Sequence, residues 1–122
     1  MDVILNIIQG LVGLAMLAAG GMKATQAKEV LEPNMAWVED FTGNQVRLIG
    51  IAELLAGIAL ALSLFITSPI ALLLGGIAAV CLAVLMGGAI YTHVRRGDSM
   101  AETIPSVIMA VLSLVIAWSL LI

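Results

Sequence analysis

Four long apolar runs constrain this chain more than any other feature, at about residues 3–24, 46–67, 70–92 and 104–122. Each holds roughly the 20 residues that a helix needs to cross the hydrocarbon core of a bilayer. A segment in lipid must satisfy its own backbone hydrogen bonds, and continuous rather than alternating apolar runs favour helices over a β-barrel. The sequence therefore predicts an all-α fold: a polytopic membrane protein built as a bundle of four transmembrane helices.

The composition agrees with lipid as the main surroundings of the chain. Of its 122 residues, 62% are hydrophobic and 11% are charged, against roughly 45–50% and about 25% in soluble domains. The five Lys and Arg residues form no patch with interleaved aromatic residues, so we expect no binding to nucleic acid. The first run lacks the basic residues that begin a signal peptide, so we expect it to be a membrane span. We predict one domain over residues 1–122.

The first connection between spans is the longest, and its sequence suggests a structure of its own. Pro33 and Gly43 are placed to begin and end a short helix within the stretch EPNMAWVEDFTG. On such a helix the apolar residues share one face and the acidic residues the other, namely Trp37, Val38 and Phe41 against Glu39 and Asp40. This pattern predicts a short helix in the membrane interface. An ordinary loop with an aromatic anchor is the alternative.

The basic residues indicate how the chain is oriented. All five lie in or beside the first and third connections: Lys23, Lys28, Arg47, Arg95 and Arg96. Connections rich in Lys and Arg stay on the cytoplasmic side of a membrane. We therefore expect a multi-pass protein of the cell (inner) membrane, with the first and third connections in the cytoplasm and both termini outside.

Glu53 is the residue that fits its surroundings least, because it interrupts the second run, VRLIGIAELLAGIALAL. A carboxylate near the bilayer centre costs about 2.5–3.5 kcal/mol on insertion scales, so Glu53 needs a partner. Gly50 and Gly57 lie three residues before it and four after it, on the same helix face. That face is therefore expected to contact another helix or a cavity rather than lipid.

Lys23 and His93 are the candidate partners of Glu53, since each stands at the cytoplasmic end of a neighbouring span. Side chains tilt toward the N-terminus of their own helix, which directs all three toward one layer of the membrane. Arg47 tilts the other way and is expected to reach the headgroups. We predict a buried polar site of Lys23, Glu53 and His93. The alternatives are that Lys23 and His93 are ordinary interfacial residues and Glu53 a structural acid.

Small residues repeat every four positions along the third span: Gly75, Ala79, Ala83 and Gly87. Such spacing lets helix backbones approach closely, so we expect this stripe to pack against a neighbouring helix or a second copy of the chain. Cys81, the single cysteine, lies in the same apolar span and is expected to be a small buried hydrophobe. The seven methionines form no cluster with His or Cys, and we predict no metal site.

Three segments resemble, in order and spacing, the DoxX-like family of small four-helix membrane proteins: GGMKA, VRLIGIAELLAGIAL and MGGAIYTHVRRGD. The resemblance covers nearly the whole chain. It places Lys23, Glu53 and His93 on the family's polar positions, with Gly50, Thr92 and Arg47 beside them. The family is named after subunits associated with thiosulfate:quinone oxidoreduction, and some members are described alongside oxidative-stress proteins. The resemblance makes a quinone one candidate ligand and a membrane redox system one candidate partner, while the residues themselves identify no cofactor.

Three classes of function are compatible with these residues. The first, which we favour, is a binding or accessory membrane protein whose Lys–Glu–His site holds a quinone, a lipid head or another amphipathic small molecule. The second is a small proton-coupled transporter, although the four-helix multidrug transporters carry their glutamate in the first span. The third is a membrane-embedded isomerase or oxidoreductase that uses Glu53 and His93 as acid and base. A single cysteine argues against a dithiol redox mechanism.

The orientation can be tested with a reporter that is active only in the cytoplasm. Fused after Ile122, the reporter should be silent in whole cells, because the positive-inside rule places the C-terminus outside. The same reporter fused after Gly97 of a truncated chain is the positive control. Strong activity of the C-terminal fusion would overturn the orientation but not the number of spans.

Overall fold

The computed structural model describes residues 3–122 and is built from helices, with no strand in that range. The elements are α1 (Val3–Thr25), α2 (Lys28–Leu31), the 3₁₀ helix η1 (Ala36–Asp40), α3 (Gly43–Phe65), α4 (Pro69–Arg96) and α5 (Met100–Leu121). Four of them, α1, α3, α4 and α5, are long and apolar enough to cross a membrane. The predicted all-α bundle of four membrane spans is confirmed. Residues 1–2 of the predicted domain lie outside the described residues.

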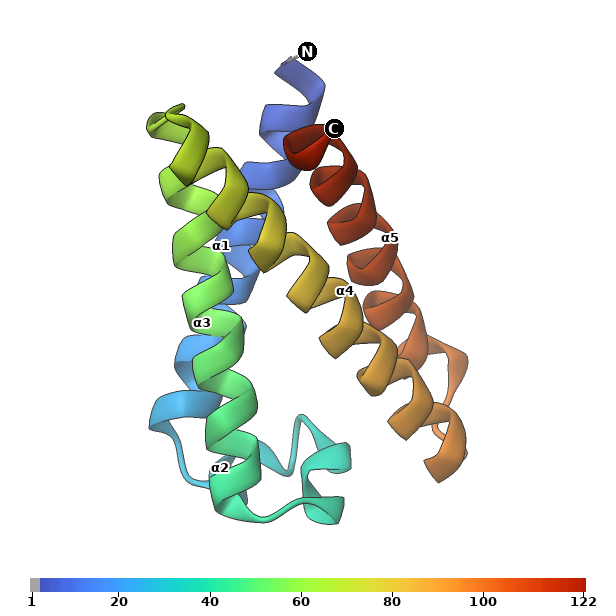
Figure 1. Ribbon diagram of the computed structural model, residues 1–122. Helices are drawn as coiled ribbons and strands as arrows, with labels where there is room; N and C mark the ends of the chain where they lie inside the picture. The colour runs from blue at the N-terminus through green and yellow to red at the C-terminus, as the bar shows by residue number, and fades with distance from the viewer. Residues whose placement is uncertain (1–2) are drawn as a thin grey trace.

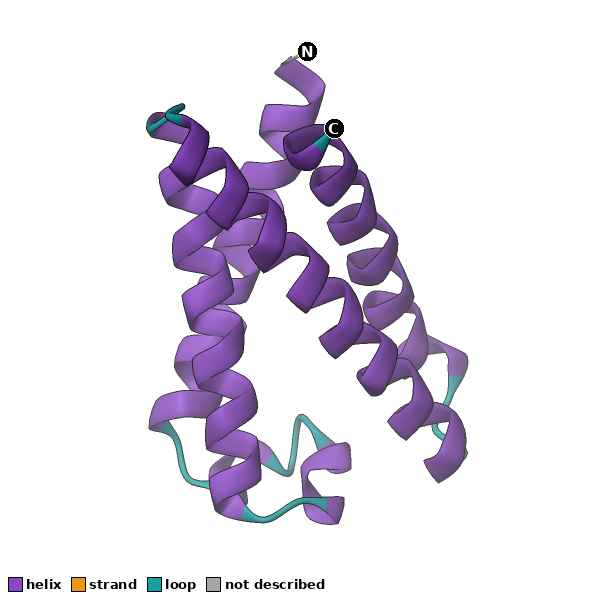
Figure 2. Cartoon of the chain, viewed as in Figure 1, coloured by secondary structure: helices purple, strands orange, loops and turns teal. Residues whose placement is uncertain are grey.

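The long helices run alternately in opposite directions, so α1 begins and α5 ends at the same end of the bundle (Figure 1). The loops and short helices at the other end are α2, η1 and the α4–α5 link (Figure 2). α1 packs along α3, and α4 packs along α5. From the turn that joins them, α3 and α4 diverge toward the end that holds η1 (Figure 1). The bundle is therefore two helix pairs that spread apart at one end.

Capping residues set helix ends that differ from the predicted ones. Thr42 and Gln45 form a capping box, in which the Thr42 hydroxyl accepts from the Gln45 backbone N–H and Gln45 Oε1 accepts from the Thr42 N–H. α3 therefore begins at Gly43, before the predicted residue 46. α4 continues to Arg96, beyond residue 92, and ends where Gly97 takes the left-handed conformation with φ of 74°.

The first connection differs from the single interfacial helix that the sequence predicts. It contains two short helices, α2 and η1, with Pro33 in the turn between them and Gly43 opening α3 instead of closing a helix. Its apolar residues form a small core: Leu31, Val38 and Val46, with Met35, Trp37 and Phe41 packed against them. The aromatic side chains of this connection therefore pack, partly buried, against a core of their own.

α1 and α3 approach each other through glycines. A Cβ added to Gly20 would lie 2.5 Å from the backbone nitrogen of Leu54, and one added to Gly50 would lie 2.5 Å from the backbone nitrogen of Ala24. About two turns further along α3, a Cβ on Gly57 would lie 2.9 Å from the carbonyl oxygen of Gly13. Backbone meets backbone along this contact, the arrangement by which small residues hold helices together in lipid.

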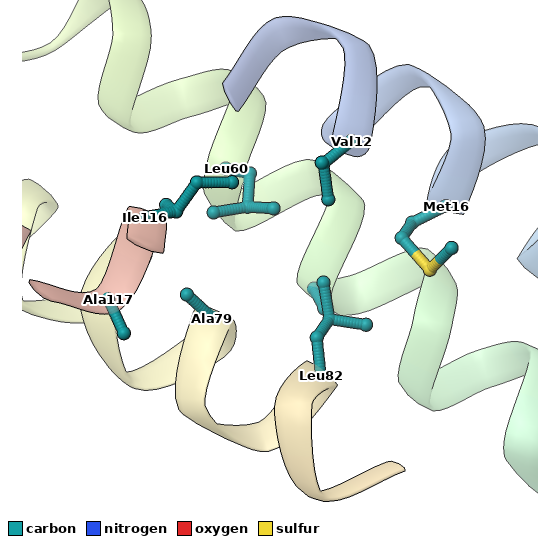
Figure 3. Packing of buried hydrophobic residues seen from close by; sticks show 8 residues of the cluster. Val12, Met16, Leu60, Ala79, Leu82, Ile116 and Ala117 are labelled. Atoms are coloured by element: carbon teal, nitrogen blue, oxygen red, sulfur yellow. The ribbon is translucent and has the colours of Figure 1, made fainter. Parts of the chain in front are cut away.

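The main core lies where all four long helices meet (Figure 3). Its buried side chains are Val12, Met16, Ala56, Leu60, Ala79, Leu82, Ile116 and Ala117. The small-residue stripe of α4 packs here only over its first half. Gly75 and Ala79 are buried and Ala83 is half-buried, whereas Gly87 is exposed with no atom within 4 Å of an added Cβ. Within one chain the stripe therefore packs at Gly75 and Ala79 but not at Gly87, and packing of Gly87 against a second copy stays a prediction.

Cys81 is exposed, so the expectation that it is buried is wrong. The inward face of α4 carries Gly75, Gly76, Ala79, Leu82 and Met86, and residue 81 lies off this face. α4 is apolar all round, so its sequence gives little contrast between the side that faces protein and the side that faces lipid.

The glycine contact can be tested with two adjacent substitutions in α1. Gly20→Ala should destabilise the protein by about 1–3 kcal/mol, since its methyl group overlaps the α3 backbone. Gly21→Ala is the matched control, because nothing lies within 4 Å of its added Cβ, and it should leave stability unchanged or slightly higher. Thermal unfolding in detergent measures both. Equal stability of the two variants would contradict the close approach of α1 and α3.

Candidate binding site

Lys23 on α1 and Glu53 on α3 form a buried ion pair. The Lys23 Nζ atom lies 2.8 Å from Glu53 Oε1 and 3.1 Å from Oε2, and the two side chains are only 9% and 3% exposed. The pair sits beside the glycine contact, where a Cβ on Gly50 would lie 2.6 Å from the Lys23 Cβ. The close backbone approach thus brings base and acid together. The ammonium group also lies 5.6 Å from the ring centroid of Trp37, a cation–π contact.

His93 on α4 pairs with Asp98 in the α4–α5 link rather than with Glu53. Its Nδ1 atom lies 2.8 Å from Asp98 Oδ2. The left-handed Gly97 turns the chain back on the helix, and the backbone N–H of Asp98 donates to the His93 carbonyl at 3.0 Å. The same turn therefore ends α4 and places the Asp98 carboxylate against the imidazole.

Asp98 is held in its ionised form. Its pKa lies below the ordinary value of 3.8, chiefly because His93 hydrogen-bonds to the carboxylate and further because Arg96 does so, which together outweigh desolvation. Asp98 is thus a carboxylate near neutral pH and accepts a hydrogen bond from the Nδ1–H of His93.

Arg96 joins the α4–α5 link to η1. Its guanidinium contacts three carboxylates: Nη2 lies 3.0 Å from Glu39 Oε1, Nη1 3.0 Å from Asp40 Oδ2, and Nε 3.1 Å from Asp98 Oδ2. A planar group with five donors suits several acceptors at once. The arginine therefore fixes both the acid that orients His93 and the segment that carries Trp37.

A cavity of about 430 Å³ lies between the two helix pairs, with Lys23, Glu53 and His93 at its wall. Its polar lining consists of Lys23, Glu53, Thr92, His93 and Ser106. Its remaining lining is apolar and comes from the long helices and the first connection: Met16, Ala19, Trp37, Phe41, Ile49, Val84, Leu85, Met86, Gly88, Ala89, Pro105 and Met109. A second cavity shares Trp37, His93, Pro105 and Ser106 with it and is otherwise lined by residues 33–36, between α2 and the start of η1, and by Glu102 on α5.

The predicted site residues therefore divide into two groups. Lys23, Glu53, Thr92 and His93 line the cavity. Lys23 pairs with Glu53, whereas His93 pairs with Asp98, so the three predicted ionisable residues do not form one hydrogen-bonded network. Thr92 donates its hydroxyl to the carbonyl of Gly88 in its own helix. The others lie elsewhere: Gly50 and Gly57 are in the α1–α3 contact, and Arg47 is exposed and outside the lining.

Sequence reasoning missed several residues of the site. Asp98 hydrogen-bonds to His93, Arg96 contacts Asp98, and Trp37 lines the cavity, yet none of the three was predicted to do so. The signal for Asp98 was present in the segment HVRRGDS, where an acid directly follows the glycine that can end a helix. At the opposite end of the bundle, Gln9 donates to the Leu60 carbonyl at 2.8 Å and to Ser63 Oγ at 2.7 Å, a satisfied pair that serves helix packing.

The side chains of His93, Asp98 and Glu102 offer metal-ligand atoms within 4.8 Å of one another. The Arg96 guanidinium, however, stands 3.1 Å from the Asp98 oxygen that also contacts His93. A cation at this position would be repelled by that charge at short range. We therefore interpret His93 and Asp98 as a hydrogen-bonded pair, whereas the Glu102 carboxylate accepts from Ser99, and the absence of a metal site stays a prediction.

Fold and site together define a four-helix integral membrane protein with a polar-ended cavity between its helices. Residues 7–117 match the DoxX-like family, and the chain belongs to that family. The family resemblance seen in three short motifs is thereby confirmed over nearly the whole chain. No curated protein matches the chain, and neither does a solved structure.

The ion pair can be tested with a double-mutant cycle. Glu53→Gln leaves the Lys23 ammonium without a counter-charge, and Lys23→Met leaves Glu53 without one, so each change should destabilise the protein. The double variant should lose less than the sum, with a coupling free energy in the range of about 0.5–3 kcal/mol for contacting residues. Unfolding of the purified protein in detergent provides the four free energies. Strict additivity would show that the two side chains act independently.

Proposed function

We propose that this protein binds an amphipathic small molecule in the cavity between its helix pairs, as a membrane binding or accessory protein. The observation that carries the proposal is the cavity itself: about 430 Å³ with mostly apolar walls and a few buried polar groups at its lining. Small-molecule sites in proteins have this character and a volume of roughly 300–1,000 Å³.

The charges around the cavity favour a neutral, hydrogen-bonding head group on the ligand. The Lys23 ammonium is already paired with Glu53, and the Asp98 carboxylate with Arg96 and His93. Each of these charged groups already has a counter-charge. A fully charged ligand would therefore find no unpaired opposite charge among them. The apolar body of the ligand would lie against the methionine and aliphatic side chains of α1, α4 and α5.

Among ligand classes, a quinone meets these requirements, because it joins a neutral polar ring to an apolar tail. The family name points the same way. A membrane redox partner would then be the natural neighbour of the protein. With the positive-inside rule, we further place α2, η1 and the α4–α5 link at the cytoplasmic face of the cell membrane, so the polar groups of the cavity lie in the cytoplasmic half.

Binding can be followed through Trp37, which lines the cavity. The second tryptophan, Trp118, is 67% exposed on α5, and Trp118→Phe leaves Trp37 as the single tryptophan. A short-chain ubiquinone analogue titrated into this variant in detergent should quench its fluorescence saturably. Quenching that rises linearly without saturation would mean partition into the micelle and would contradict the proposal.

Two adjacent glycines of α4 provide a matched pair of variants. An added Cβ meets no atom within 4 Å at either Gly87 or Gly88, but only Gly88 lines the cavity. Gly88→Leu should fill cavity space and weaken binding by about tenfold or more, equivalent to about 1.4 kcal/mol. Gly87→Leu should leave the affinity unchanged. Equal affinities in the two variants would place the ligand outside the cavity.

A further inference from the structure

His93 is the one histidine of the chain, and its two ring nitrogens have different surroundings. Nδ1 lies 2.8 Å from the Asp98 carboxylate, which the Arg96 side chain contacts at 3.1 Å. A carboxylate accepts hydrogen bonds and cannot donate them, so the neutral imidazole carries its proton on Nδ1. The lone pair of the neutral ring is then on Nε2.

Nε2 is the imidazole nitrogen left for the cavity. The residue is 7% exposed and lines the cavity. Among residues 3–122, the His93 side chain hydrogen-bonds only to Asp98, through Nδ1, so Nε2 has no protein partner. Nε2 is an acceptor at the cavity wall, and a ligand that covers it without bringing an N–H or O–H group would leave that acceptor unsatisfied.

We propose that the cavity selects amphipathic molecules with a hydroxyl head, such as long-chain alcohols, phenols or quinols, whose O–H donates to Nε2 of His93. This inference rests on the proposed binding function and narrows its ligand class. A head group that offers only carbonyl or ether oxygens can occupy the cavity but lacks this hydrogen bond, so a quinone should bind more weakly than its quinol. Asp98 and Arg96 act as positioning residues, since they fix the tautomer without touching the ligand.

The tautomer can be measured directly by NMR, because a ¹⁵N-histidine label gives signals from His93 alone. For the neutral imidazole of the ligand-free protein we expect a protonated Nδ1 and an unprotonated Nε2. Asp98→Asn should raise the population of the opposite tautomer, since an amide can also donate to Nδ1. A ligand-free protein with its proton mainly on Nε2 would overturn the inference whatever binds in the cavity.

The ligand preference can be measured with 4-nonylphenol and its methyl ether, which differ only in the hydroxyl hydrogen and a methyl group. Competition against the quinone analogue in the Trp118→Phe protein should show the phenol binding about tenfold more tightly, as expected for one added hydrogen bond. In His93→Phe the ratio should fall to about one, while cavity-dependent competition by both probes persists.

The possible results separate the inference from the binding function on which it rests. Saturable competition by both probes with equal affinity would overturn the hydroxyl preference and leave the binding function standing. Competition by neither probe, with no saturable quenching by the quinone, would overturn both. A phenol preference that survives unchanged in His93→Phe would assign the selectivity to another residue and overturn the role of Nε2. Folding of each variant is checked by circular dichroism and size-exclusion elution in detergent.

Discussion

The backbone contact between α1 and α3 is the constraint on which the rest of the structure depends. Gly13, Gly20, Gly50 and Gly57 remove the side chains that would hold the two helices apart, and lipid supplies no hydrophobic force to press them together. With the backbones this close, Lys23 and Glu53 meet as a buried pair. The pair is costly to desolvate, so it relies on tight surrounding packing. Helix contact and ion pair thus support each other.

A rigid α1–α3 pair allows α4 and α5 to lean away from it. The four helices share one core near the middle and at the end where the chain begins and ends, where Gly76 of α4 receives Leu121 of α5. Beyond that core the pairs spread, and the space between them is the cavity. Glycines of α4 serve two purposes: Gly75 and Gly76 admit close neighbours, whereas Gly88 keeps volume open. Affinity for a ligand therefore depends on where packing stops as much as on the polar groups.

The sequence predicts what depends on lengths and local geometry, and less of what depends on tertiary contacts. Four spans follow from the length of the apolar runs, and the meeting of Lys23 with Glu53 follows from side-chain tilt and flanking glycines. The partner of His93 could not be inferred in this way, because it depends on one left-handed residue, Gly97, that reverses the chain. The sequence did not show that Cys81 and Gly87 of α4 are exposed. An almost wholly apolar helix has few polar residues that would distinguish its outer face from its inner face.

The contacts of Arg96 have a mechanical consequence. At one end the helix pairs are joined by interdigitated apolar side chains, a contact that is insensitive to dissolved ions. At the other end, η1 reaches α4 and the following link through a guanidinium shared among Glu39, Asp40 and Asp98. Charged contacts near water weaken as ionic strength rises. Apolar contacts therefore hold the bundle together at one end, whereas salt-sensitive ion pairs do so at the other. These ion pairs hold η1, the segment that carries Trp37 of the cavity lining.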